Sequence, residues 1–349
     1  MMGTWAVCGA QTQTSQYQPG VTAEGAVYFL PKTALRISVL VEKTTYRPGD
    51  FAPYAQRYLR LKDVPQEEYT QYRVISVGQT AIGVADTTKR YAVKFNPKTV
   101  AANLSLSDDG RLLGINSEAK DIALPAPFVA AEKAAPVNPR QFMNEEILAA
   151  GSTAKMAELT AREIYDLREN RNLLIKGQAD FMPKDGDQLK LMLSYIDDQD
   201  RALTSLFKGI TERDTTEHIL TVIPDGPMER QVLFRLSQQV GMVEADDYSG
   251  APFYITVEDL KTVPPVDEEA ASKTKKKQYE AGVYVNIPGK MRVTIFQGID
   301  VLQTQEHTAG QFGNVELLSG ELFNKRYDTH LWLNPVSGGV DRLQADQPE

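Results

Sequence analysis

Two long stretches in which apolar and polar residues alternate constrain the fold of this chain most strongly. The first runs from Gly25 to Ile115 and is clearest at Leu35–Val41. The pattern returns after Gly209, for example at Phe253–Val257. A period of two is typical of β-strands that bury one face. The chain is therefore predicted to be rich in antiparallel strands.

Residues that favour turns suggest where these strands end. We expect a turn at Gly78, another at Asp108–Gly110, and a type II turn at Pro288 and Gly289 that pairs Met291–Phe296 back as a hairpin. One short helix is expected to interrupt the first stretch, with Asp50 as its cap.

The residues between the two alternating stretches have helical spacing. Ser152 or Thr153 can cap a first helix, which breaks at Gly177. Asp185 can cap a second helix, with Gly209 as its stop. Two helices of this length joined by a short loop should lie antiparallel.

These patterns predict an α+β fold with two β-rich antiparallel domains and a helical hairpin between them. The expected divisions are residues 11–140, 141–209 and 210–349. A Pro- and Ala-rich segment, 122–140, is predicted to be the crossover between domains. The polar segment 263–278 mixes both charges and is predicted to be a solvated loop.

The composition excludes several classes of protein. With 349 residues, 42% of them hydrophobic, the chain can build a large core. Its net charge of −8 argues against a nucleic-acid partner, because such binding needs clustered Lys and Arg. No run beyond residue 10 is apolar and long enough to cross a bilayer, so the protein is not expected to span a membrane.

The first ten residues carry no charge and end in small side chains. We interpret them as the tail of a secretory signal peptide whose start lies upstream, with cleavage between Ala10 and Gln11. Lipidation of Cys8 is a weaker reading because Val7 is bulky, and a disordered cytoplasmic terminus is a further alternative. Cleavage would remove the only cysteine. The expected location is the periplasm or the exterior.

No residue pattern indicates catalysis, a metal or a cofactor. His218, His307 and His330 are too far apart in sequence for a helical or hairpin metal pair, although separate strands could bring them together, and we expect isolated imidazoles. Metalloprotease, nucleotide-binding and α/β-hydrolase motifs are absent from the sequence. Ser152–Lys155 matches the SxxK element of penicillin-binding proteins, but their SxN and KTG elements are missing, so a helix cap explains Ser152 better.

Two further features bear on an enzymatic alternative. Asp197, Asp198 and Asp200 form an acidic cluster, and paired carboxylates can hydrolyse glycosidic bonds. We expect these aspartates to lie on a solvated helix face. Trp332 shares a strand face with His330, opposite Leu331 and Leu333. Either face could be the buried one, and we favour Trp332 as part of the core.

Several short segments are spread over both β-rich regions: Tyr28–Thr33, Tyr46–Gly49, Phe51–Ala55, Gly282–Val285, Pro288 with Gly289, Gln311–Gly313, and Asn334 with Pro335. In these segments the chain as a whole resembles a family of uncharacterised proteins from gut Bacteroidetes, classed as a domain of unknown function. The resemblance implies an exported envelope protein with two β-rich parts, and it supplies no activity, cofactor or ligand-binding residue.

The sequence thus leads to the hypothesis of an exported, non-enzymatic protein that acts by binding or structural assembly in the cell envelope. Its partner would be an unknown envelope protein or glycan. The alternative is an envelope glycan hydrolase that uses paired carboxylates, which would require two acids converging in a cleft, at least one with a raised pKa.

Overall fold

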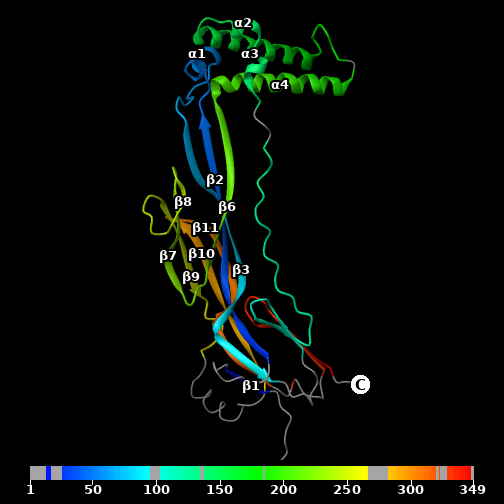
Figure 1. Cartoon of the computed structure of the whole chain (residues 1–349), viewed down its shortest axis with the longest axis vertical. Helices are drawn as coiled ribbons and strands as arrows, with labels where there is room; N and C mark the ends of the chain where they lie inside the picture. Colours follow the sequence, from blue (N-terminus) through cyan, green and yellow to red (C-terminus); the bar gives the residue numbers. More distant parts are fainter. Residues whose placement is uncertain are drawn as a thin grey trace, which may run out of the picture.

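The computed structural model describes residues 13–16, 26–94, 103–133, 137–183, 185–265, 282–319, 322 and 328–346. They form three antiparallel sheets and a helical hairpin, which confirms the predicted α+β class. Figure 1 shows an elongated molecule whose helices gather at one end of long strands. We call this end the head. It contains η1 (Ala52–Tyr54), α1 (Ala55–Leu59), η2 (Pro139–Phe142), α2 (Glu145–Leu148), α3 (Thr153–Lys176) and α4 (Gly186–Lys208).

The first sheet has the strand order β1-β3-β2-β6 and extends from the head to the opposite end of the molecule. Its strands are β1 (Gln13–Gln16), β2 (Ala26–Arg47), β3 (Tyr69–Lys94) and β6 (Ile210–Val222). Close to the head only β2, β3 and β6 are present. We call that ribbon, residues 42–47, 69–73 and 210–215, the stalk.

The turn expected at Gly78 does not exist. Gly78 lies inside β3 and pairs with Ser38 of β2, and both strands continue past it. The connection between β2 and β3 is instead the segment 48–68, which contains the short helices η1 and α1. A glycine within a long strand is tolerated here because the adjacent residues keep their pairing with β2.

The second sheet has the strand order β11-β10-β9-β7-β8. The expected Pro288–Gly289 turn is also wrong, because β10 runs straight through it with a bulge between Ile287 and Gly289. A Cβ on Gly289 would lie 2.1 Å from the carbonyl oxygen of Phe312, so glycine allows the backbones to approach. The strands are β7 (Met228–Ser237), β8 (Gly241–Val243), β9 (Ala251–Asp259), β10 (Gly282–Gln297) and β11 (Asp300–Ser319).

The first and second sheets pack face to face as a sandwich. The inward residues of β2 meet those of β7, β9 and β10, and the rings of Phe234 and Phe253 stack at 4.4 Å. Residues before and after the hairpin thus share this core and, through β6, the first sheet. That 11–140 and 210–349 form separate domains remains a prediction. The buried members are Leu35, Ile37, Val39, Val41, Phe234, Leu236, Phe253, Ile255, Val257, Met291, Val293, Ile295 and Ala309.

A third, smaller sheet lies at the end of the molecule away from the head. Its strand order is β13-β12-β5-β4, and its strands are β4 (Leu104–Leu106), β5 (Leu112–Ile115), β12 (Asp328–Leu333) and β13 (Val340–Asp346). The turn predicted at Asp108–Gly110 joins β4 to β5 and is confirmed. Leu331 and Leu333 are buried, whereas Trp332 is only half-buried and lies 4.9 Å from the Arg342 guanidinium. The expectation that Trp332 belongs to the core was wrong.

Most of the predicted helix ends are confirmed. The Ser152 hydroxyl accepts a hydrogen bond from the Lys155 N–H at 3.2 Å, and the Asp185 carboxylate accepts one from the Gln188 N–H at 2.7 Å. Gly177 closes α3 in the left-handed region. The Asp50 cap was wrong: η1 begins after Phe51, and no side chain caps it.

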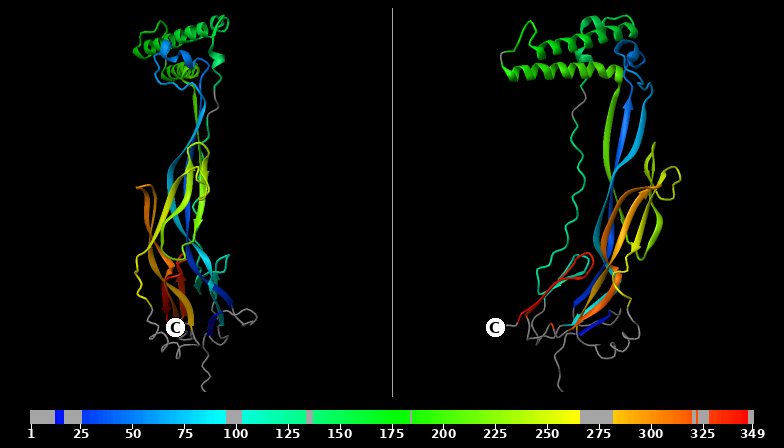
Figure 2. Two further views of the ribbon diagram at one scale, coloured as in Figure 1. Left: turned by 90° about the vertical axis from the view of Figure 1, so that its left-hand side faces the viewer. Right: turned by 180° about the vertical axis from the view of Figure 1, so that it is seen from behind.

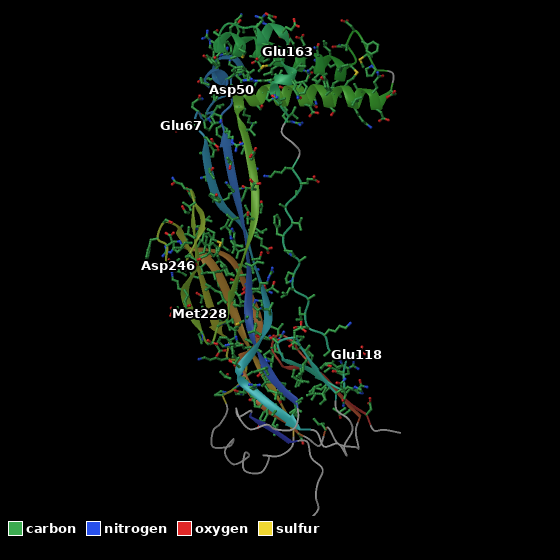
Figure 3. All side chains as sticks on the ribbon, viewed as in Figure 1. Asp50, Glu67, Glu118, Glu163, Met228 and Asp246 are labelled. Carbon is green, nitrogen blue, oxygen red and sulfur yellow. The ribbon has the colours of Figure 1, made fainter. Side chains whose placement is uncertain are left out.

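The predicted crossover is extended. Residues 118–133 contain no helix or strand, and the chain runs beside the long axis from the third sheet to the head (Figures 1 and 2). Figure 3 shows Glu118 at the lower end of this path and Glu163 in the head. The Phe128 N–H donates to Glu217 of β6. No helix in the described part of the chain is long and apolar enough to cross a bilayer.

Candidate binding surfaces

Interhelical ion pairs fix the hairpin of the head. Arg168 donates two hydrogen bonds to the Asp200 carboxylate, from Nη2 to Oδ1 at 2.9 Å and from Nε to Oδ2 at 3.0 Å. One turn away, the Arg171 Nε lies 2.6 Å from Asp197 Oδ1. From Arg168 to Arg171 the residue number in α3 rises, while that of the partner in α4 falls from Asp200 to Asp197. The helices are therefore antiparallel, as predicted.

The same ion pairs account for the acidic cluster. The hydrogen bond from Arg171 holds the pKa of the Asp197 carboxyl below its usual value. Asp198 pairs with Arg201 at 3.0 Å, within its own helix. These aspartates therefore pair with arginine, whereas a general acid needs a carboxyl group with a raised pKa.

The head is anchored to the stalk by the C-terminal turns of α4. Phe207 is fully buried, and its ring lies 5.3 Å from that of Phe51. The Leu206 carbonyl accepts a hydrogen bond from the Phe51 N–H at 2.7 Å. Gly49 permits this contact, because a Cβ there would lie 2.2 Å from the same carbonyl oxygen.

The opposite half of the hairpin leaves large apolar side chains exposed. The buried residues of α4 all lie near its C-terminus, whereas Leu191 is 71% exposed and Tyr195 59%. Ile175 at the end of α3 and Phe181 in the connecting loop are also largely exposed. We call these four residues the distal apolar patch. Figure 2 shows that this half of the hairpin projects sideways from the stalk.

A second surface is a groove between β3 and the second sheet. Its cavity has a volume of about 460 Å³. β3 forms one wall with residues 72–77. The floor and far wall come from the second sheet and comprise Leu236, Gln238, Ala251, Phe253, Gln297 and Leu302.

Several buried polar atoms of β3 and β11 have no hydrogen-bond partner among the described residues. Gln79, two positions beyond the groove wall on the same face of β3, has an unpartnered Oε1. His307 Nε2 and Gln303 Oε1, which share a face of β11, are in the same situation. Burial lowers the pKa of the His307 imidazole, so its neutral form is favoured.

The structure separates the other sequence candidates. His218 lies on β6, His307 on β11 and His330 on β12, and within the described ranges no group of side chains has the composition of a metal site. The Lys155 Nζ pairs with Glu158 at 3.0 Å, while Ser152 caps α3, as expected. The predicted cleavage site at Ala10 and Gln11 lies outside the described residues, as do residues 266–278 of the predicted charged loop.

Neither surface was predicted from the sequence. The helical spacing of α4 does not show the distal apolar patch, because the start of α4 lies beyond the anchored part of the head. The groove exists because β3 lacks a neighbouring strand along part of one edge. The alternation of apolar and polar residues does not show which strand is at an edge. A polar Gln79 at an inward strand position was the one available signal.

Comparison with known proteins identifies a family but no characterised relative. No curated protein and no solved structure matches the chain significantly. A family model described as a domain of unknown function, DUF4831, matches residues 24–341, which include the head and every strand except β1 and most of β13. The expected resemblance to a family of unknown function is thereby confirmed, while source and export are not addressed by the match. The chain belongs to the DUF4831 family.

Proposed function

We propose that this protein is exported to the cell envelope and acts there by binding or structural assembly, without catalysing a reaction. The observation that carries the proposal is the distal apolar patch, presented by a rigidly anchored hairpin at the end of a stalk. Large apolar side chains that are exposed to solvent can contribute to an interaction site, and a large aliphatic side chain contributes about 1.5–3 kcal/mol when a partner fully buries it.

The anchoring of the head supports a binding role. The arginine–aspartate pairs and the Phe207–Phe51 contact hold the hairpin before any partner arrives. A preorganised surface loses less conformational entropy on association than a flexible one. The patch is therefore suited to a protein partner with a complementary apolar surface.

Export is proposed from the uncharged segment that ends at Ala10, and the absence of cysteine beyond Cys8 is compatible with it. The partner would then be a protein or glycan of the envelope.

The alternative, a glycan hydrolase, receives less support. A general acid needs a raised pKa, but four described carboxyl groups with shifted pKa values all have them lowered. At Asp109 burial raises the pKa and hydrogen bonds outweigh it. At Asp197, Glu217 and Asp247 hydrogen bonds stabilise the carboxylate. None of these four carboxyl groups is therefore poised as an acid.

Site-specific photo-cross-linking in the native host tests the proposal. A benzophenone amino acid replaces Leu191 in the patch or, as a control, the still more exposed Tyr248 in the loop before β9. We expect one discrete adduct in the envelope fraction from position 191 and none from position 248. Adducts equal at both positions, or release of sugars from envelope glycans by the purified protein, would contradict the proposed function.

A further inference from the structure

We propose that the open edge of β3, together with the floor of the groove, accepts an extended peptide strand from a partner protein as an added strand of the first sheet. This inference rests on the proposed binding function but concerns a surface separate from the distal apolar patch.

No described strand pairs with the middle of the outer edge of β3. β2 borders one side of β3 throughout, whereas on the other side β1 pairs only with residues 91–94. At each end of the remaining edge a single contact caps the backbone. The Tyr72 N–H donates to the Gln238 carbonyl at 2.8 Å, and the Ala85 N–H donates to the Asp109 carboxylate at 3.1 Å.

These two capped groups reveal which backbone groups face outward between them. In an antiparallel pair, alternate residues direct both backbone groups to the neighbouring strand, so the others point away. The backbone N–H groups of Tyr72 and Ala85 both point away from β2. In an uninterrupted strand an even-numbered and an odd-numbered residue would point to opposite sides, but the extra residue of the bulge at Ile75 shifts the alternation by one.

It follows that Val74, Val77, Gln79 and Ala81 direct their N–H and C=O groups to the open edge. No described strand pairs with them there. Such a row of donors and acceptors is the template for strand addition. The open stretch, residues 74–81, suits a strand of about seven residues at roughly 3.4 Å per residue.

The groove also defines the side chains of the occupant. Leu236 and Phe253 form an apolar floor beneath the edge. Arg73 is the one charged residue among the groove-lining residues, and its Nε is bonded to Glu42 at 2.8 Å. An uncharged strand with apolar residues at alternate positions is complementary to this lining.

The outward backbone groups of β3 favour a polypeptide over a lipid or a sugar. A paired strand offers a regular row of N–H and C=O groups to Val77, Gln79 and Ala81. A hydrocarbon chain would leave these backbone groups of β3 without partners. A sugar could offer hydroxyl groups but not the regular spacing of the edge.

The test uses a fluorescent peptide, Thr-Val-Thr-Val-Thr-Val-Thr with blocked ends, added to the purified full chain. Binding is followed by fluorescence anisotropy, and amide exchange is followed by NMR. We expect saturable binding and protection of the amides of Val77, Gln79 and Ala81. N-methylation of the peptide at the amides on one edge should weaken binding at least tenfold, because strand pairing needs those groups.

Two matched variants place the site. Ile75→Lys adds a charge at the rim of the groove, where Ile75 is exposed, and should weaken binding at least tenfold. Ile219→Lys makes the same change at a similarly exposed position on β6, at the other edge of the sheet, and should change binding less than twofold. Circular dichroism checks that both variants are folded.

Several results would overturn the inference: no saturable binding, equal binding of the N-methylated peptide, or equal effects of the two variants. If these occur while cross-linking from position 191 persists, strand addition is wrong and the proposed function stands. If the peptide binds as expected but cross-linking fails, the role assigned to the head is wrong instead.

Discussion

Phe207 is the residue whose removal should separate the stability of the head from that of the sandwich. Its side chain is fully buried at the end of α4, where it meets Phe51 and joins the hairpin to the stalk. Phe207→Ala deletes this ring and leaves a cavity between α4 and η1. The hydrogen bond from the Phe51 N–H to Leu206 is a backbone contact and is not removed directly.

The magnitude follows from burial. Truncation of a buried phenylalanine to alanine costs about 3–5 kcal/mol, and this site is closely packed on several sides. A cost near 4 kcal/mol lowers the folded-to-unfolded ratio of the head roughly a thousandfold. Leu191→Ala is the control in the same helix: because Leu191 is exposed, its loss should change stability by no more than about 0.5 kcal/mol.

Urea unfolding followed by far-ultraviolet circular dichroism measures the helices, and native-state hydrogen exchange locates the loss. In Phe207→Ala we expect the amides of α3 and α4 to lose protection, while those of β9 and β10 retain it. A loss of stability below about 1 kcal/mol would refute the anchoring role of Phe207. An equal loss of protection in β9 and β10 would refute the separation of head and sandwich.

Three other predictions concern single sites. Ser152→Ala should cost about 0.5–2 kcal/mol in urea unfolding, whereas Ser152→Asp should be tolerated because aspartate also caps and suits the helix dipole. Burial lowers the pKa of His307, so the unfolded state takes up its proton first and stability should fall as pH drops below about 6.5. His307→Gln should reduce that fall in pH-dependent unfolding and His218→Gln should not. Trypsin should cut first near Lys273–Lys277, and first cleavage within α4 would contradict the loop assignment.

Local chemistry made part of the fold predictable. In the caps at Ser152 and Asp185 the side chain accepts a hydrogen bond from the backbone N–H three residues later. Both partners are neighbours in sequence, so the cap can be predicted from a short segment. The alternation of β9 likewise follows from its own burial, with Phe253, Ile255 and Val257 facing inward.

Predictions failed where the deciding contact is distant. Gly78 and Gly289 have the composition of turns, but partners far away in sequence keep them in strands: Ser38 for Gly78, and the Phe312 backbone for Gly289. The pairing of β6 with β2 joins segments more than 160 residues apart, such as Thr45 with Glu212. No local pattern reports such a pair.

The candidate surfaces were unpredictable for a related reason. Whether Leu191 is exposed depends on how much of α4 the head covers, and whether β3 has an open edge depends on where β1 ends. Both are properties of neighbours and not of the residues themselves. The ion pairs of Asp197 and Asp200 were likewise missed, because their arginine partners lie on the other helix of the hairpin.

The claim on which the account depends most is that this protein works outside the cytoplasm. Fractionation of the native host, followed by intact-mass measurement of the protein in each fraction, tests it directly. The account predicts a chain that begins at Gln11 and is recovered from the periplasmic or secreted fraction. A chain that retains Met1 and is recovered from the cytosol would contradict it.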